Sequence, residues 1–292
     1  MRLLFIVHFV FWWLTGFSQV ITLDSIKRIM LPESDEINPS WSADGRYLIF
    51  QSNQHGQWDI YIYDFSLDSL QNITLSNSDE TDPVFFPHSN TNISFVLKKE
   101  EFTVLYKMDI LSSTKKPLFN RDIYALSPSF SPSGRLVVFK GYDHNTENWQ
   151  VFTYDFIYDN LNKLTNYKHH EIFSPQFSPD GRAILFGLKD KRYPYPESLI
   201  EISWYGKKQQ EIDSVSANNF CWTANAFRII CSENRKPGSN QLLSIRKDGS
   251  KSFTLTKNRY PKASPAVSSD GTKMAVAIKT DGNYDIVIFK LR

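Results

Sequence analysis

The chain has 292 residues, of which 33 are Lys or Arg and 31 are Asp or Glu, so its formal net charge at pH 7 is +2. A surface that binds nucleic acid needs a concentration of basic residues, and this nearly balanced charge gives no reason to expect one. We therefore expect no nucleic-acid partner.

The N-terminus has the features of an export signal. Arg2 precedes an apolar stretch that runs to Leu14, and the small residues Gly16 and Ser18 occupy the two positions that a signal peptidase reads. The apolar part is short for a membrane span, and no later segment approaches the length that a span needs. We expect residues 1–18 to be a cleaved signal peptide, which makes the protein periplasmic or secreted. An uncleaved N-terminal anchor is the alternative.

After this segment, one short motif recurs six times at nearly equal intervals. The clearest copy, Pro-Ser-Trp-Ser-Ala-Asp-Gly-Arg at 39–46, is followed by the apolar run 47–50. Similar copies follow at 128–135, 175–182 and 265–273, and worn copies without the Gly stand at 83–89 and 220–226. The aromatic residue or Val of each copy lies at positions 41, 85, 130, 177, 222 and 267, so the steps are 44 to 47 residues. A fixed period of this size is typical of a repeat architecture.

Each repeat unit predicts four β-strands and no helix. In the first unit we expect strands near 39–42, 47–51, 58–63 and 72–75, because aromatic and β-branched residues alternate there between clusters of turn residues. The Gly of each well-preserved copy suits the positive φ of a tight hairpin. Four strands in one unit make a propeller blade, so the repeat predicts an all-β fold, a six-bladed β-propeller over residues 19–292.

The two ends of the repeat array predict how the ring closes. The last unit lacks its fourth strand, since only residues 284–291 and Arg292 follow its second apolar run. A strand-like segment at 25–30 precedes the first unit, and Ile29 lies ten residues before Pro39, as Leu255 lies ten before Pro265. An open ring would leave a bare sheet edge. We therefore expect the N-terminal strand to complete the last blade.

The two cysteines, Cys221 and Cys231, flank the worn fifth hairpin. A three-residue turn centred on Asn225 would place Cys221 opposite Ile229 and Cys231 diagonally, about 7–8 Å away, which is beyond the usual disulfide reach. We expect two buried thiols that form no bridge, although an exported protein permits a disulfide and a different register would allow one.

The motif resembles the repeat of a known family. The Pro-x-(Trp/Phe)-Ser-x-(Asp/Ser)-Gly-Arg hairpin, followed by an alternating strand such as Trp58-Asp59-Ile60-Tyr61, is similar to the TolB-like, WD-like β-propeller repeat. The match is good in units one, three, four and six, while units two and five depart at the turn. The resemblance implies a six-bladed propeller and a bacterial envelope protein, but it specifies no activity because such propellers carry unrelated functions.

Local catalytic signatures are absent from the sequence: it has no Gly-x-Ser-x-Gly elbow, no His-Glu-x-x-His helix and no phosphate-binding Gly-rich loop. His169, His170 and Glu171 offer metal-ligand chemistry. Adjacent side chains on an extended segment point to opposite faces, however, so we favour an exposed polar loop. We assign no catalytic residue and expect no metal or other cofactor.

Polar residues gather in the segments just before the inner strand of each unit. In a propeller these loops meet on one face around the central channel, and loops on a rigid scaffold are where binding residues concentrate. The face would be acidic beside units one and two, and ordinary exposed loops are the alternative reading. The expected partner-binding residues are Glu33, Asp35, Glu36, Asp79, Glu80, Asp82, Asp122, His170 and Glu171.

Aromatic residues divide into two groups by their place in the repeat. Trp41, Phe130, Phe177 and Trp222 recur at one position, which predicts packing between neighbouring blades. The aromatic residues of 193–196 and the pair at 204–205 lie outside the repeat pattern and are candidates for partner contact, because Tyr and Trp are favoured at interfaces. For 193–196 a loop-stabilising role is the alternative.

Together these features support an exported, non-enzymatic propeller that binds a protein or envelope-associated partner through the loop face around its channel. The alternative is a carbohydrate-binding module, or a propeller hydrolase or lyase whose site lies in the channel mouth. Such an enzyme can assemble its site from residues scattered over several blades, without a local motif.

Overall fold

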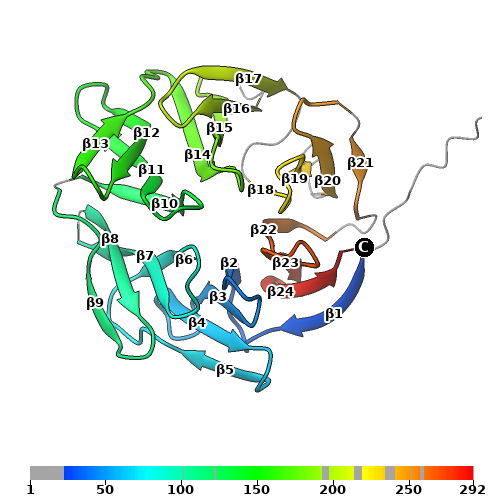
Figure 1. The fold of residues 1–292 in the computed structure, drawn as a ribbon. Coiled ribbons are helices and arrows are strands. Elements are labelled where there is room, and N and C mark those ends of the chain that lie inside the picture. The colour runs from blue at the N-terminus through cyan, green and yellow to red at the C-terminus, as the bar shows by residue number, and fades with distance from the viewer. Residues whose placement is uncertain are drawn as a thin grey trace, which may run out of the picture.

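The computed structural model describes residues 23–100, 102–121, 123–192, 197–213, 219–233, 241–250, 252–256 and 260–291. Within these ranges, 24 strands form six four-stranded antiparallel sheets, and no residue is helical. The sheets are arranged as blades around a central axis (Figure 1). The predicted six-bladed β-propeller is confirmed. The described part of the chain has no helix long and apolar enough to span a membrane.

In blades 1 to 5 the strands follow one another in sequence from the axis outward, and in blade 6 the outermost strand is β1. Blades 1 and 2 contain β2 (Glu36–Trp41), β3 (Tyr47–Ser52), β4 (Asp59–Asp64), β5 (Ser69–Asn72), β6 (Glu80–Phe85), β7 (Asn92–Lys99), β8 (Phe102–Asp109) and β9 (Thr114–Pro117). Blades 3 and 4 contain β10 (Ala125–Phe130), β11 (Leu136–Asp143), β12 (Asn148–Asp155), β13 (Asn160–Lys163), β14 (His170–Phe177), β15 (Ala183–Asp190), β16 (Glu197–Ser203) and β17 (Lys208–Asp213). Blades 5 and 6 contain β18 (Phe220–Trp222), β19 (Arg228–Glu233), β20 (Gln241–Arg246), β21 (Phe253–Thr254), β22 (Lys262–Val267), β23 (Lys273–Thr280), β24 (Asn283–Lys290) and β1 (Asp24–Ile29).

The ring closes through the first strand, as the sequence predicted. Strand β1 pairs antiparallel with β24 as the outermost strand of blade 6, with Ile29 opposite Ile286. Ile29 is buried in the cluster between blades 6 and 1. The Nζ of Lys27 also lies 2.5 Å from the carboxylate of Asp68 in blade 1. Main-chain pairing, apolar burial and an ion pair therefore hold the closing strand.

Hydrogen bonds between polar residues stabilise the turn of the repeated hairpin. In blade 1 the Oγ of Ser42 donates to Asp44, and the same Asp44 carboxylate accepts from the Arg46 N–H. Gly45 has a φ of 68°, in the left-handed region that Gly adopts without strain. In the worn fifth copy Ala226 takes this place with a φ of 58°. The worn copy therefore forms the same hairpin, with backbone strain where Gly is missing.

Each of five inner strands, β2, β6, β10, β14 and β22, is interrupted by a bulge that shapes the centre of the molecule. In β2 the pairing register with β3 shifts between Ile37 and Ser40, and the intervening Asn38 has a φ of 54°. A Pro follows the bulged residue, which suits a place where the ladder is broken because Pro donates no N–H. The equivalent bulged residues are Asp82, Ser127, Ser174 and Ser264.

Apolar side chains fill the spaces between neighbouring blades. Trp41 of blade 1 packs in a cluster with Ala275 and Ile286 of blade 6, and Trp222 of blade 5 packs with Leu185 of blade 4. The Trp41 indole Nε1 donates to the carbonyl oxygen of Ala266 at 3.1 Å. The prediction that the recurring aromatic residues pack between blades is confirmed.

The cysteines are buried and form no disulfide, as expected, but the expected register of their hairpin was wrong by one residue. Cys221 lies opposite Ile230, not Ile229, because Thr223 and Arg228 close a longer turn. Cys221 and Cys231 point to opposite faces of the blade and belong to different apolar clusters. Burial raises the pKa of the Cys221 thiol, which keeps it protonated and unreactive.

Candidate functional site

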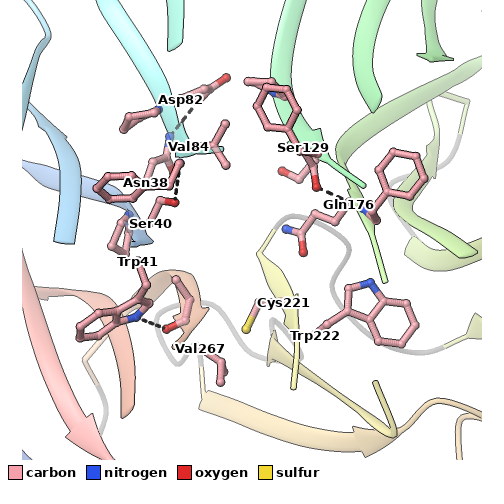
Figure 2. Close-up of a pocket in the computed structure, with 18 of the residues that line it drawn as sticks. Asn38, Ser40, Trp41, Asp82, Val84, Ser129, Gln176, Cys221, Trp222 and Val267 are labelled. Atoms are coloured by element: carbon pink, nitrogen blue, oxygen red, sulfur yellow. Dashed lines mark hydrogen bonds between the residues drawn. The ribbon is translucent and has the colours of Figure 1, made fainter. Parts of the chain in front are cut away.

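The centre of the propeller is a cavity of about 590 Å³. Side chains from all six inner strands surround it (Figure 2). Five blades contribute the bulged residue, the residue two places later and part of the hairpin turn, and blade 5 contributes residues 219–222. The repeat therefore brings chemically different residues to equivalent places around one axis.

The five bulged residues and Asn219, which directly precedes β18, form a polar ring, which we call the channel ring: Asn38, Asp82, Ser127, Ser174, Asn219 and Ser264. Hydrogen bonds join five of these six residues across blade boundaries. The Ser264 Oγ donates to Asn38 at 2.6 Å, and the Asn38 Nδ2 donates to Asp82 at 2.9 Å. The N–H and Oγ of Ser127 donate to the other oxygen of Asp82 at 2.9 and 3.2 Å, and the Ser264 N–H donates to Asn219 at 3.2 Å.

Asp82 is the ionisable member of the channel ring. Burial raises the pKa of its carboxyl group, against the opposing effect of the donors from Ser127 and of the positive charge on Lys140. Burial likewise lowers the pKa of Lys140, which the negative charges of Glu171 and Asp82 oppose. The positive charge of Lys140 thus interacts with Asp82, while only Asp82 of the two lines the cavity.

A second layer lies two residues further along each inner strand and contains Ser40, Ser129 and Gln176. Each of these three bonds to the next blade: Ser129 Oγ accepts from the Phe177 N–H at 3.1 Å, and Gln176 Nε2 donates to the Phe220 carbonyl at 2.9 Å. Ser40 accepts from the Phe85 N–H at 3.3 Å. The polar groups of this layer therefore hold neighbouring blades together in the wall of the cavity.

One buried donor in the cavity wall is without a partner in the described residues. The Trp222 side chain is only 5% exposed, and its indole Nε1 meets no acceptor there. The equivalent Trp41 donates to a carbonyl. An unsatisfied buried N–H costs free energy, which an oxygen acceptor inserted against the indole would recover, although the Nε1 atom itself is buried.

Two of the predicted site residues, Glu36 and Glu80, begin their inner strands and are fully buried. Glu36 accepts from the hydroxyls of Ser34 at 2.7 Å and Ser52 at 2.9 Å, and burial raises the pKa of its carboxyl group. Glu80 lies 3.1 Å from the Nζ of Lys115. Both carboxylates bond within the protein.

Other predicted residues lie on the loops of the mouth face. Asp35 accepts from the N–H of Tyr284 at 2.8 Å and so links blade 1 to blade 6. Asp79 accepts from the Trp58 N–H at 3.1 Å. Glu33 is exposed on the connection that leads into β2. Asp122 lies outside the described residues.

His170 and Glu171 lie at the start of β14. The His170 ring packs 5.0 Å from Tyr167 and its Nε2 lies 3.9 Å from Asp190. Among the residues that the structure describes, no three His, Cys, Asp or Glu side chains gather as a metal site would need. Of the nine predicted residues, Asp82 alone lines the central cavity.

Sequence reasoning missed the other members of the channel ring. A signal for them exists, since the residue directly before the motif Pro is Asn38, Asp82, Ser127, Ser174 or Ser264 in five copies and is polar in all of them. The bulge that directs these residues to the axis cannot be read from the period alone, because an unbroken strand would alternate regularly.

Solved structures resemble this fold over most of its length. A TolB from Acinetobacter baumannii superposes with a TM-score of 0.65 at 18% identity, covering 80% of this chain and 57% of that chain. An oligogalacturonate lyase from Vibrio parahaemolyticus gives a TM-score of 0.62 at 10% identity, covering 92% of this chain and 97% of that chain. At such identities the likeness shows the fold alone.

Sequence comparison is more specific. The Tol-Pal system protein TolB of Francisella tularensis subsp. holarctica (strain OSU18) is 28% identical over 170 residues, which are 57% of this chain and 38% of that relative. The match thus spans well under half of the relative's length. The family model for the TolB beta propeller domain, PD40, matches residues 19–226, which is more than half of the chain. This chain therefore belongs to the TolB β-propeller domain family.

Proposed function

We propose that this protein is an exported, non-catalytic binding protein that holds a protein partner at the mouth of its central channel. The cavity at the axis carries the proposal, because it joins open volume to polar groups from several blades. Two of these groups suit a partner's main chain or side chains: the partly desolvated Asp82 carboxylate and the unsatisfied Trp222 N–H.

The hydrogen-bonding properties of these two groups indicate what kind of partner would bind. Asp82 accepts hydrogen bonds, and the Trp222 Nε1 donates one, so the pair matches the N–H and C=O groups of an extended protein segment. Glu33, Asp35 and Asp79 on the mouth loops favour a segment with positive charge beside blades 1 and 2. The membership of the family makes a component of a Tol-Pal system the first partner to test.

The remaining expected residues have different roles in this proposal. Glu36 and Glu80 position the inner strands from beneath, since their side chains are buried. His170 and Glu171 lie at the mouth end of blade 4, at the start of β14. Asp122, outside the described residues, stays a predicted contact. Export through the 1–18 signal, and a periplasmic or secreted location, stay part of the proposal.

Affinity capture from cell-envelope extract after gentle crosslinking tests this function. Wild-type protein should enrich one defined partner, and Asp82→Asn or Trp222→Phe should weaken the purified complex at least about tenfold, which corresponds to about 1.4 kcal/mol. Asp281→Asn is the matched control, because Asp281 is exposed on the β23–β24 hairpin outside the cavity. No enriched partner, or equal losses in all three variants, would refute the proposal.

The carbohydrate-binding or enzymatic alternative has its own tests. Full-length fold likeness to a lyase does not carry a reaction to this chain, and we propose no catalytic step. Thermal stabilisation of the purified protein by an oligosaccharide, or a metal bound in stoichiometric amount, would favour that alternative over a protein partner.

A further inference from the structure

The face opposite the channel mouth is unusually rich in exposed apolar side chains. Strands one and three of each antiparallel blade run in the same direction, so the turns that follow them lie on one face, which we call the turn face. Of the twelve exposed large apolar side chains in the described residues, seven lie there: Leu67, Leu111, Ile157, Tyr158, Trp204, Tyr205 and Phe227. Single exposed apolar residues are ordinary, but a recurrence at the same turn of four successive blades is not.

On blades 3 and 4, Arg135 lies between the aromatic side chains of neighbouring turns. The Arg135 guanidinium lies 4.8 Å from the centre of the Tyr158 ring. Arg135 and Trp204 line one shallow cavity of about 340 Å³ between the two blades, and the Trp204 and Tyr205 rings meet edge to face at 5.5 Å. Trp204 is 48% exposed and Tyr205 62%.

Charge on the turn face is divided between its two sides. The turns of blades 4 and 5, at 178–183, 203–208, 223–228 and 246–250, contain six Lys or Arg and two Asp. The corresponding turns of blades 1 to 3 contain two Arg and six Asp. The exposed cations Arg182, Lys207 and Arg246 thus belong to the turns of the same two blades that carry the exposed Trp204, Tyr205 and Phe227.

We propose that the turn face of blades 4 and 5 docks on an anionic lipid bilayer. Trp204, Tyr205 and Phe227 enter the headgroup region, where amphipathic aromatic rings are favoured. Arg182, Lys207 and Arg246 bind the anionic headgroups. Trp204 and Tyr205 project together from one turn and Phe227 from another, a shape that suits insertion between lipids better than contact with a flat protein surface. This inference does not depend on the partner at the mouth.

Sedimentation with vesicles tests the docking. The full chain should partition onto vesicles of phosphatidylcholine with phosphatidylglycerol, bind phosphatidylcholine alone weakly, and lose affinity as salt rises. The double variant Trp204→Ala/Tyr205→Ala should bind at least about tenfold more weakly. Arg182→Gln and Arg246→Gln should each cost roughly fivefold.

Phe102→Ala is the matched control, because Phe102 is 46% exposed but lies on the opposite face, at the start of β8. Segment 1–18 is common to all variants, so differences between them isolate the turn face. Quenching by brominated lipid that disappears in Trp204→Phe would locate the contact. Equal binding by wild type and the double variant, or an equal loss in Phe102→Ala, would overturn the proposal. So would variants that alter only self-association or binding to an acidic protein.

Discussion

Trp41 and Trp222 occupy the same place in two blades, yet their indole N–H groups differ. The Nε1 of Trp41 donates to Ala266, whereas the Nε1 of Trp222 has no acceptor in the described residues. Both side chains are buried and pack between blades. The pair therefore separates the contribution of ring burial from that of the hydrogen bond.

This difference predicts unequal costs of substitution by Phe. Trp41→Phe should lower the free energy of unfolding by about 1 kcal/mol more than Trp222→Phe, because only the first removes a hydrogen bond. Urea denaturation of both variants measures the difference. Equal losses would show that the donor of Trp222 is satisfied in solution, and would weaken its proposed role in partner binding.

Glu36 gives a pH-dependent prediction at the same scale. Burial raises the pKa of its carboxyl group in the folded state, so the folded protein holds this proton more tightly than the unfolded chain. Its contribution to stability is thus present at low pH and is lost as pH rises from about 4.5, by at most about 1.4 kcal/mol per pH unit.

Glu36→Gln should remove this dependence of the unfolding free energy on pH. The difference in unfolding free energy, wild type minus variant, should fall between pH 4 and pH 7 in urea titrations. A difference that stays constant or rises over this interval would contradict the assignment. Asp281→Asn, at an exposed position, serves as the control.

At the scale of single elements, the hairpin turns show a cost that Gly avoids. An added Cβ at Gly45 meets nothing within 4 Å, so substitution there tests the backbone conformation alone. Gly45→Ala should lower the unfolding free energy by about 1 kcal/mol, since φ is 68°. Gly45→Asn should cost less, because Asn tolerates this region. Thermal or urea denaturation compares the two, and equal costs would point to a relaxed turn.

The closing strand offers a second element-scale test. Ile29 is 4% exposed and Ile26, on the same strand, is 52% exposed. Ile29→Ala should cost about 2–4 kcal/mol through the lost contacts in the cluster between blades 6 and 1, whereas Ile26→Ala should change stability by less than about 0.5 kcal/mol. Comparable effects of the two substitutions would mean that β1 does not seal the ring in solution.

The elements were predictable from sequence to different degrees. The period fixed the blades, the hairpin turns and the closure through 25–30, because each unit repeats the same apolar alternation and must bury the same face. The register of the blade 5 hairpin was predicted wrongly, since its turn, which includes Thr223 and Asn225, is longer than the expected one. Most of the channel ring was not predicted, because a bulge changes which side chain faces the axis.

Predicting the site residues also required the direction of each side chain, which the sequence does not give. Glu36, Glu80 and Asp82 fall within one short stretch of equivalent units, yet the first two are buried beneath the mouth and the third lines the cavity. Which acidic residue faces solvent depends on side-chain direction along a bulged strand. Polar composition of the loops could not resolve this.

At the scale of the whole molecule, the mouth loops and the turn face lie on opposite faces of the ring, and the central cavity extends to the first hairpin turns of most blades. The residues tested at the two sites are nevertheless different, Asp82 in the cavity and Trp204 with Tyr205 on the turn face, so a partner and a bilayer can be bound independently. Asp82→Asn should therefore leave vesicle binding unchanged, and Trp204→Ala/Tyr205→Ala should leave partner binding unchanged. Measuring both affinities for both variants tests this independence, and a loss of both activities in either variant would instead indicate coupling.

The pairing of β1 with β24 has a consequence for the order of events in folding. Ile29 and Ile286 meet only after the strands of all six blades have been synthesised. Until β1 pairs with it, β24 has an open edge, and a contact of such long sequence separation forms slowly. We expect an intermediate with an unclosed sixth blade that is prone to association with other chains. A chaperone that covered the β24 edge would act on the closure of the ring.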